Sequence, residues 1–532
     1  MHSNSPGAQQ KLRAIHQAWR RGDAQAAVAA CQAMNREFPD DGEGWFASSV
    51  VALQLGAVPE ALKFVGTALG IRPEEAAWRL HELRCLQAAG QLDQAVPGLR
   101  DLAGQASGDA ALLGETGLLA GSMGEHALAE ELFQECLDLD SGNARSHYNL
   151  AATQRYLGKL DEALAHVDRA IELNPLDHDA HYLRSSLKRW TLETNHVDAL
   201  QSALDGIGGK PIAEAQLCYA LAKELEDCEQ HEASFQWLGQ GAAVRRENMQ
   251  YELREDLGFI EALIDVYDPE FLKAPSGGFE SEEPLFVLGL PRTGTTLAER
   301  ILGACEGVTS IGESTVFTRL VASAAQQVDP SPQASRSDLV RATAHIPFRQ
   351  LGEEYVRRAR PPQAGYTHFV DKFPGNSLNI GAIHKALPRA RIVLLERHPM
   401  DTCYAMFKAL FTDIYPFSYD LEELGQYFVA HQGLIQHWRH VLGDRIYTLR
   451  YETLVGETED EARRLLDHCR LPWQPECLEF QRNPQASTTA SASQVRQGIY
   501  TSSVGLWKKY REQLAPLEQR LREAGCLEGW TE

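Results

Sequence analysis

The chain has 532 residues, of which 44% are hydrophobic and 23% charged, an ordinary balance for a globular protein long enough to form two or more domains. Its formal net charge of -22 argues against broad binding to nucleic acid or to an acidic membrane, because phosphate contacts require a basic surface. Any anionic ligand must therefore be held by a local group of arginine and lysine residues.

The ten cysteines form no C-x-x-C pair and show no metal-ligand spacing, so we expect small buried residues or free thiols in a reducing compartment. No run of about 18 apolar residues occurs, and the N-terminus lacks the apolar core of a signal peptide. These features predict a soluble, cytoplasmic protein that binds neither membrane nor metal.

The first part of the chain repeats with a period of 34 residues. Glycines and alanines recur in one register, at Gly22, Gly56, Gly90, Gly124 and Gly158 and at Ala27, Ala61, Ala95, Ala129 and Ala163. The pattern predicts units of two helices joined at the glycine, with the small alanine where the second helix crosses the first. The period resembles that of the tetratricopeptide repeat.

After Pro175 the register weakens, although residues 181–205 and 213–247 keep a helical periodicity, the latter as a degenerate pair that caps the stack. We therefore predict an all-α solenoid over residues 1–265, whose concave groove is open to a protein partner or an extended ligand. The alternatives are that the repeats only scaffold the second domain or mediate self-association, for example in a homodimer, and the sequence leaves the three open.

Residues 266–283 combine proline, glycine, serine and acidic residues and predict an exposed linker. The remaining residues, 284–532, have the size of one domain, and their strand, loop and helix patterns predict an α/β fold with a central parallel sheet.

The second domain opens with PLFVLGLPRTGTTLAERI, residues 284–301, which predicts a buried strand, an anion-cradling loop and the first turns of a helix. Gly289 and Gly294 have the spacing of a P-loop. Thr295, however, stands where the P-loop lysine would be, and Arg292 supplies the only positive charge inside the loop. Such a loop suits a phosphate but not the hydrolysis of ATP or GTP.

Further polar residues follow the other predicted strands. Glu313 stands at a strand-to-helix turn, Lys372 lies between an apolar strand and a Pro-Gly turn, and Arg397 follows a third apolar run. Open α/β sheets bind ligands at the carboxyl ends of their strands, which makes all three candidates. A long polar loop, residues 486–503, leads into a helix with Lys508, and such loops are commonly lids or binding loops.

With PRTGTT at residues 291–296 and RHPMD at residues 397–401, the chain resembles the sulfotransferases that use 3′-phosphoadenosine 5′-phosphosulfate (PAPS). It is most similar to the bacterial-type tetratricopeptide repeat sulfotransferases, and more distantly to the tyrosylprotein sulfotransferases. The resemblance covers nearly all of the chain, because repeats also precede the catalytic domain in that family. It implies an enzyme that transfers a sulfuryl group from PAPS, as co-substrate, to an acceptor hydroxyl.

The resemblance also implies roles for individual residues. The 5′-phosphosulfate would be bound by Arg292, Thr293, Gly294, Thr295 and Thr296, the 3′-phosphate by Arg397, and the nucleotide further by Arg496 and Lys508 of the C-terminal loop. Glu313 corresponds to the glutamate base of the tyrosylprotein enzymes, Lys372 to their catalytic lysine, and Ser491 to a serine at the sulfonate, with Ser493 as an alternative. Where many relatives share the 3′-phosphate with a serine, this chain has Ala405, and Thr402, Arg496 or Lys508 would have to compensate.

The chemistry accounts for these residue types. Sulfuryl transfer is an in-line displacement at sulfur, in which positioned cations and backbone donors stabilise the charge on the leaving oxygen. Arg292 and Lys372 are the cations at hand, and Glu313 can accept the proton of the attacking hydroxyl. His368 is a rival base, although a histidine flanked by apolar strand residues is more often structural. No metal is required.

The sequence does not identify the acceptor, which could be a peptide, a protein, a glycan or a small hydroxylated molecule. Two other functions remain as alternatives. The first is a nucleotide-dependent kinase or NTPase, against which the missing P-loop lysine argues. The second is a repeat-based adaptor with a PAPS-binding but weakly active nucleotide domain, for which Ala405 is the only hint.

Overall fold

The computed structural model describes residues 5–275, 277–361, 365–412, 414–479 and 503–530. It divides into two compact units, Met1–Pro175 and Leu176–Glu532. The linker predicted at residues 266–283 falls inside the second unit, so a domain boundary at that point stays a prediction.

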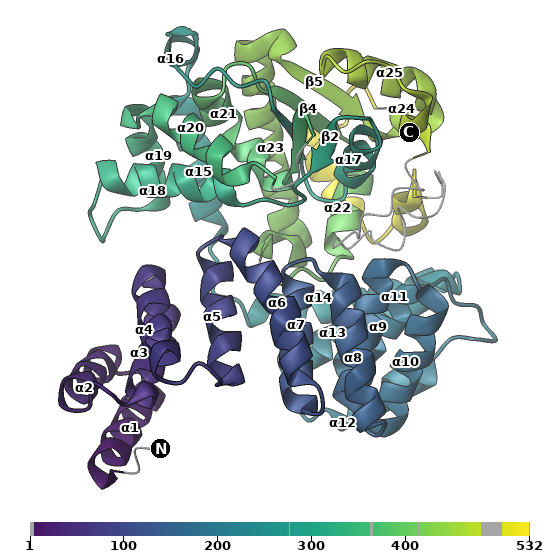
Figure 1. Ribbon diagram of the computed structural model, residues 1–532. Helices are drawn as coiled ribbons and strands as arrows, with labels where there is room; N and C mark the ends of the chain where they lie inside the picture. The colour runs from purple at the N-terminus through teal and green to yellow at the C-terminus, as the bar shows by residue number, and fades with distance from the viewer. Residues whose placement is uncertain (1–4, 276, 362–364, 413, 480–502, 531–532) are drawn as a thin grey trace. The chain divides into compact units, whose positions relative to one another are not determined.

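Over residues 5–175 the first unit consists of paired helices, and Figure 1 shows their up-and-down order. Their bounds are α1 (Pro6–Arg20), α2 (Ala24–Glu37), α3 (Gly42–Gln54), α4 (Val58–Ile71), α5 (Ala76–Ala88), α6 (Leu92–Ala106), α7 (Ala110–Ser122), α8 (His126–Leu139), α9 (Ala144–Leu157) and α10 (Leu160–Leu173). The predicted all-α repeat architecture is confirmed.

The 34-residue register has a direct structural cause. Each of its five glycines ends the first helix of a pair with φ between 73° and 86°, a left-handed conformation that side chains with a Cβ rarely adopt. Each of its five alanines is fully buried, so a larger side chain would push the paired helices apart. The glycines therefore set the turn and the alanines set the spacing.

The second unit begins with helices α11 (His178–Leu187), α12 (Val197–Gly206), α13 (Pro211–Asp227), α14 (His231–Glu247), α15 (Leu253–Val266) and α16 (Pro269–Lys273). Helices α13 and α14 pack against each other as the predicted degenerate pair.

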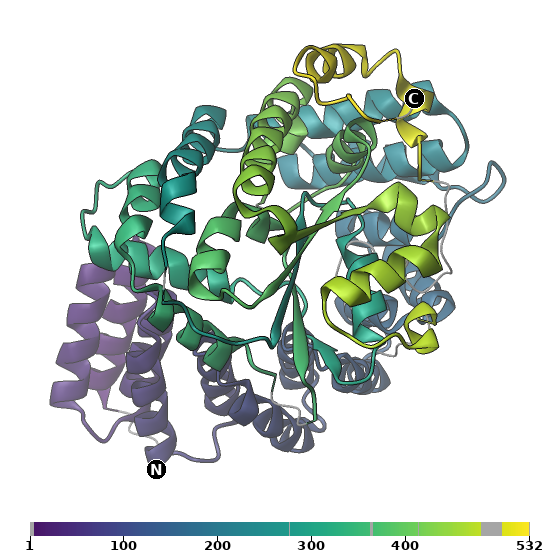
Figure 2. The same cartoon turned by 90° about the horizontal axis from the view of Figure 1, so that it is seen from above.

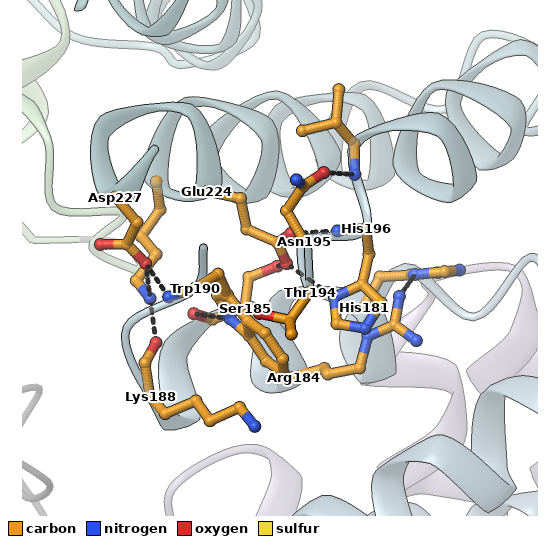
Figure 3. A network of polar contacts seen from close by, with 12 residues as sticks. His181, Arg184, Ser185, Lys188, Trp190, Thr194, Asn195, His196, Glu224 and Asp227 are labelled. Carbon is orange, nitrogen blue, oxygen red and sulfur yellow. Dashed lines mark hydrogen bonds and ion pairs between the residues drawn. The ribbon is translucent and has the colours of Figure 1, made fainter. Parts of the chain in front are cut away.

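A buried carboxylate organises the loop between α11 and α12 (Figure 3). Glu224 of α13 is fully buried, and it accepts hydrogen bonds from Ser185 Oγ at 2.6 Å, His196 N at 2.6 Å and His196 Nδ1 at 3.3 Å. These bonds, together with a 2.9 Å bond from Trp190 N to Asp227 Oδ2, connect both ends of the loop to α13.

The rest of the unit is built on a parallel sheet with strand order β2-β3-β1-β4-β5. The strands are β1 (Pro284–Gly289), β2 (Val308–Ser310), β3 (His368–Lys372), β4 (Arg391–Glu396) and β5 (Ile446–Arg450). In the register of the sheet, Val287 lies opposite Lys372 and Gly289 lies opposite Leu395. The carboxyl ends of these strands therefore meet at one edge.

Helices cover both faces of this sheet (Figures 1 and 2). Leu285 and Val287 of β1 pack into the core under α17, whereas Phe286 and Leu288 pack into the larger core on the other face. All of β1 is thus buried, as its continuous apolar sequence predicts. The helices that follow β1 are α17 (Thr295–Gly303), α18 (Val316–Val328), α19 (Arg336–Ala342), α20 (Phe348–Ala359), α21 (Ile380–Ala386), α22 (Pro399–Phe407), α23 (Leu421–Leu442), α24 (Tyr451–Gly456), α25 (Thr458–His468) and α26 (Ala515–Glu523).

The sulfur atoms of Cys305 and Cys477 form a disulfide that joins the end of α17 to the short 3₁₀ helix η5 (Pro475–Leu478). The expectation of free thiols is wrong for this pair, because the two cysteines are 172 residues apart and only the fold brings them together. The other eight cysteines, all in the described part of the chain, are free. Within the same described ranges, no helix is both long and apolar enough to span a membrane.

Candidate active site at the carboxyl edge of the sheet

The candidate site lies where the five strands end. After β1 the chain builds β2 and β3 on one side of it and then crosses to β4 on the other side. Such a reversal leaves a crevice at the carboxyl ends of the central strands, the usual ligand position in open parallel sheets. Arg292, Glu313, Lys372 and Arg397 all follow or end strands at this edge.

The loop after β1 has a strained backbone. Arg292 adopts φ 68°, which is uncommon for a residue with a side chain, and Gly294 adopts φ 99°. A Cβ on Gly294 would lie 2.5 Å from the ring of Tyr451, so only glycine fits there. The hydroxyl of Thr293 donates to the carbonyl of Leu290 at 2.7 Å and closes the loop on itself.

Helix α17 begins directly at this loop. Its N-cap, Gly294, provides no side-chain cap, and Thr295 and Thr296 in its first turn are buried. The first amides of a helix lack intrahelical acceptors and carry the positive end of its dipole, so they suit an anion. The predicted geometry of strand, loop and helix is therefore present.

Arg397, the first residue of the RHPMD motif, contacts the loop after β1. Its Nη1 donates to the carbonyl of Arg292 at 3.1 Å, Nη2 donates to the carbonyl of Ser503, and the guanidinium lies 5.0 Å from the ring centroid of Tyr451. The third nitrogen, Nε, is buried and has no hydrogen-bond acceptor within the described residues. The Arg397 guanidinium thus contacts the backbone of the Arg292 loop, 105 positions earlier in the sequence.

Lys372 and Glu313 contact each other directly. The ammonium of Lys372 lies 2.5 Å from Glu313 Oε1 and 3.7 Å from Oε2 of Glu299 on α17. The lysine side chain is 1% exposed and the Glu313 side chain 44% exposed, so the pair has a buried cation and a solvent-facing carboxylate. Lys372 N also donates to the carbonyl of Gly312 at 3.0 Å, which connects the two strand ends.

Asp371, the neighbour of Lys372 on β3, does not take part in this cluster. Burial raises the pKa of Asp371 to about 7, although a 2.7 Å hydrogen bond from Tyr355 opposes the rise. Successive strand residues point to opposite faces, so Asp371 faces α20 whereas Lys372 faces α17. His368, the rival base, lies at the other end of β3, away from Glu313.

The C-terminal segment is connected to the site by Asp401 of α22. Its carboxylate accepts hydrogen bonds from Gly505 N at 2.6 Å and Trp507 N at 3.2 Å, and it is almost completely buried. Lys508 follows in the 3₁₀ helix η7 (Leu506–Tyr510) and is exposed. Ser491, Ser493 and Arg496 lie outside the described residues.

Ala405, at the position where many relatives have a serine, is buried. Ala405 is 7% exposed on α22. The hydroxyl of Thr402 donates to the carbonyls of Arg397 and His398, at 3.2 Å each, so it is already engaged in the turn. Lys508 remains as a described candidate to compensate for Ala405.

Two residues of this edge were not singled out from the sequence, Glu299 and Tyr451. Glu299 stands four positions after Thr295 and therefore on the same face of α17, which was an available signal. Tyr451 follows directly after β5, but its packing against Gly294 and Arg397 depends on the sheet order, which the sequence alone does not give.

Comparison with known proteins finds two kinds of family along the chain. Residues 284–475 match the model of the sulfotransferase family, and residues 12–76 and 144–176 match models of the tetratricopeptide repeat. The sulfotransferase match contains the Arg292 loop, Glu313, Lys372 and Arg397.

Individual relatives are distant. A protein of Aquifex aeolicus (strain VF5), named only as an uncharacterized protein, is 29% identical over 374 residues, which are 69% of this chain and 49% of that protein. The chain thus spans about half the length of this relative. Among solved structures, a thermophilic tetratricopeptide repeat protein of Thermus thermophilus is 26% identical, with 34% of this chain and 98% of that chain covered and a TM-score of 0.28. A tetratricopeptide repeat protein from Parabacteroides merdae ATCC 43184 is 16% identical, with 47% and 95% covered and a TM-score of 0.34.

Proposed function

We propose that this chain, which combines tetratricopeptide repeats with a sulfotransferase-family domain, transfers the sulfuryl group of PAPS to an acceptor hydroxyl. The observation that carries the proposal is the contact between Arg397 and the Arg292 loop. It supports a site in which Arg397 and Arg292, from two different strand ends, would both face an anion at the uncapped start of α17. A nucleotide with anionic groups at both its 5′ and 3′ positions needs two such cationic stations.

The residues present fit this ligand. The amides of the loop and of α17, with Arg292, Thr295 and Thr296, would bind the 5′-phosphosulfate. Arg397 would bind the 3′-phosphate, and its buried Nε, without an acceptor among the described residues, is a donor still to be satisfied. Lys508 would add charge from the C-terminal segment that Asp401 holds in place.

The transfer step needs a base and a cation near the leaving oxygen. The acceptor oxygen forms a bond to sulfur while the bond between sulfur and the bridging oxygen of the 5′-phosphate breaks. The acceptor proton passes to Glu313, and the electron pair of the broken bond stays on the departing phosphate oxygen, where Lys372 and Arg292 stabilise it. No atom is oxidised or reduced.

The missing P-loop lysine supports this function over hydrolysis of ATP or GTP. In P-loop enzymes that lysine reaches the β- and γ-phosphates, whereas Thr295 here is short and uncharged. The repeats are proposed to recruit the acceptor, or a protein that carries it, since stacked repeats commonly offer an extended binding surface.

The test is transfer of ³⁵S from labelled PAPS by the purified full chain. The acceptor panel contains a tyrosine-containing peptide, a hydroxylated glycan and a small phenol, with binding of the product nucleotide, 3′-phosphoadenosine 5′-phosphate (PAP), measured by calorimetry in parallel. We expect PAP to bind and Arg292→Ala to weaken binding strongly, while Arg349→Ala, an exposed arginine on α20, leaves it unchanged. An intact chain that does not bind PAP, or whose binding is indifferent to Arg292→Ala, would overturn the proposal.

A further inference from the structure

Lys372 has two carboxylate partners, and the proposed reaction can use only one of them as a base. Glu313 is the close partner at 2.5 Å and half exposed, whereas Glu299 is the distant partner at 3.7 Å with a side chain that is 12% exposed. Glu299 is itself held, because Ser310 Oγ donates to its Oε1 at 2.5 Å. The other oxygen, Oε2, is the one that faces the lysine.

The close pair is incompatible with the transfer step. The Glu313 oxygen that accepts this hydrogen bond is occupied by the ammonium and does not face an acceptor hydroxyl at the same time. An ammonium held by Glu313 is likewise not available to a leaving oxygen. The pair seen here must therefore separate before Glu313 can accept a proton and Lys372 can donate a hydrogen bond to the nucleotide.

Glu299 belongs to α17, the helix that begins at the anion-binding loop. It stands one helical turn after Thr295, on the face of α17 that begins at the anion-binding loop. An ammonium that moves from Glu313 toward Glu299 therefore moves toward the helix that starts at that loop. Asp371 does not compete for the lysine, because it faces the opposite side of β3 and its two carboxylate oxygens bond Tyr355 and Asn376.

We propose that Glu299 is a positioning residue that receives Lys372 when the nucleotide binds and thereby frees Glu313 to act as the base. The inference rests on the proposed sulfuryl transfer and deepens it. In this scheme, binding of the anionic co-substrate releases Glu313 from Lys372, so that Glu313 can act as the base. Without nucleotide, Lys372 keeps Glu313 occupied. With nucleotide, the ammonium is shared between Glu299 and the ligand.

A purely structural role for Glu299 gives a different expectation. If its carboxylate only stabilised the buried lysine, neutralising it would lower stability and nucleotide affinity together. If it positions the lysine, its loss removes a negative charge near an anionic ligand and leaves affinity equal or higher, while Lys372 stays on Glu313 and turnover falls. The two roles thus predict different combinations of nucleotide affinity and turnover.

The experiment compares the wild-type full chain with Glu299→Gln, Glu299→Asp and the control Glu306→Gln, an exposed glutamate just past α17. PAP affinity is measured by calorimetry, and PAP release from PAPS is measured with the acceptor panel and with water as acceptor. We expect Glu299→Gln to bind PAP within about 3-fold of wild type or more tightly, and to turn over PAPS at least about 10-fold more slowly. Glu299→Asp should recover part of the turnover, and Glu306→Gln should match wild type.

A crystal structure with PAP bound provides a readout that does not depend on turnover. It should place Lys372 Nζ within hydrogen-bond distance of Glu299 and separate it from Glu313. A lysine that stays on Glu313 with PAP bound, or a Glu299→Gln variant with wild-type turnover, would overturn the inference. Failure of the wild-type chain to bind PAP would instead overturn the proposed function.

Discussion

Replacing Arg397 with lysine would keep the positive charge but remove the planar fork of the guanidinium. In the structure two nitrogens of the fork donate to the carbonyls of Arg292 and Ser503, and the plane packs on Tyr451. A single ammonium can reach only one of the two carbonyls. Loss of one charged hydrogen bond and of the packing on the ring should lower the free energy of unfolding by about 2 kcal/mol.

The effect on the ligand is separable from this stability loss. Arg397 is proposed to bind the 3′-phosphate, and loss of one charge-assisted hydrogen bond to a phosphate costs about 1.5–3 kcal/mol, or about 10- to 150-fold in affinity. Calorimetry with PAP and with adenosine 5′-monophosphate, which lacks the 3′-phosphate, isolates the contribution of the 3′-phosphate to the affinity. Arg397→Lys should weaken PAP by that factor and leave the monophosphate nearly unchanged.

Arg349→Lys on α20 is the matched control, because that arginine is exposed and should change neither affinity. Equal weakening of both nucleotides by Arg397→Lys would show that the arginine only shapes the site. An unchanged PAP affinity would refute the assignment of Arg397 to the 3′-phosphate.

Three further changes test how the described side chains hold the site and its supporting helices. Asp401→Asn puts an amide group against two backbone N–H donors that the carboxylate now accepts, so it should cost about 2–4 kcal/mol of unfolding free energy and hasten proteolysis after residue 502. Glu224→Gln should lower the free energy of unfolding in urea by a similar amount. Burial opposes ionisation of Glu224, but hydrogen bonds from His196 and Ser185 outweigh it and lower the pKa of the carboxyl. The extra stability of the wild type over the variant should therefore be present above pH 4.5 and decline as pH falls below it. Burial raises the pKa of Asp371 to about 7, so the fold favours its protonated form and the wild type should lose up to about 4 kcal/mol of unfolding free energy as pH rises from about 4 to 7. Asp371→Asn should not show this pH-dependent loss. An unchanged pH slope in the variant would contradict this cause.

Features that depend on local chain geometry could be predicted from the sequence. The glycine at the end of each first repeat helix has positive φ because the turn requires it, and that requirement is visible as a 34-residue period. The strand at residues 284–289 is visible because both of its faces are buried, which removes polar residues from the run. The loop after it is visible because Gly294 adopts a φ of 99°, a backbone conformation that favours glycine.

Features that depend on which distant elements pack together could not be predicted. The disulfide between Cys305 and Cys477 and the packing of Tyr451 on Arg397 follow from the order of strands and helices, and no local pattern encodes them. The contact of Lys372 with Glu313 and Glu299 is of the same kind. Residue types named Glu313 and Lys372 as candidates, but only the structure shows that their side chains contact each other.

The measurement that tests the account most directly is a titration of the wild-type full chain with PAP and with ATP at the same ionic strength. A site built from the Arg292 loop and Arg397, without a P-loop lysine, should bind PAP at least about 100-fold more tightly than ATP. Equal or tighter binding of ATP, or no binding of PAP by the folded chain, would contradict the assignment of this site to a 3′-phosphorylated sulfuryl donor.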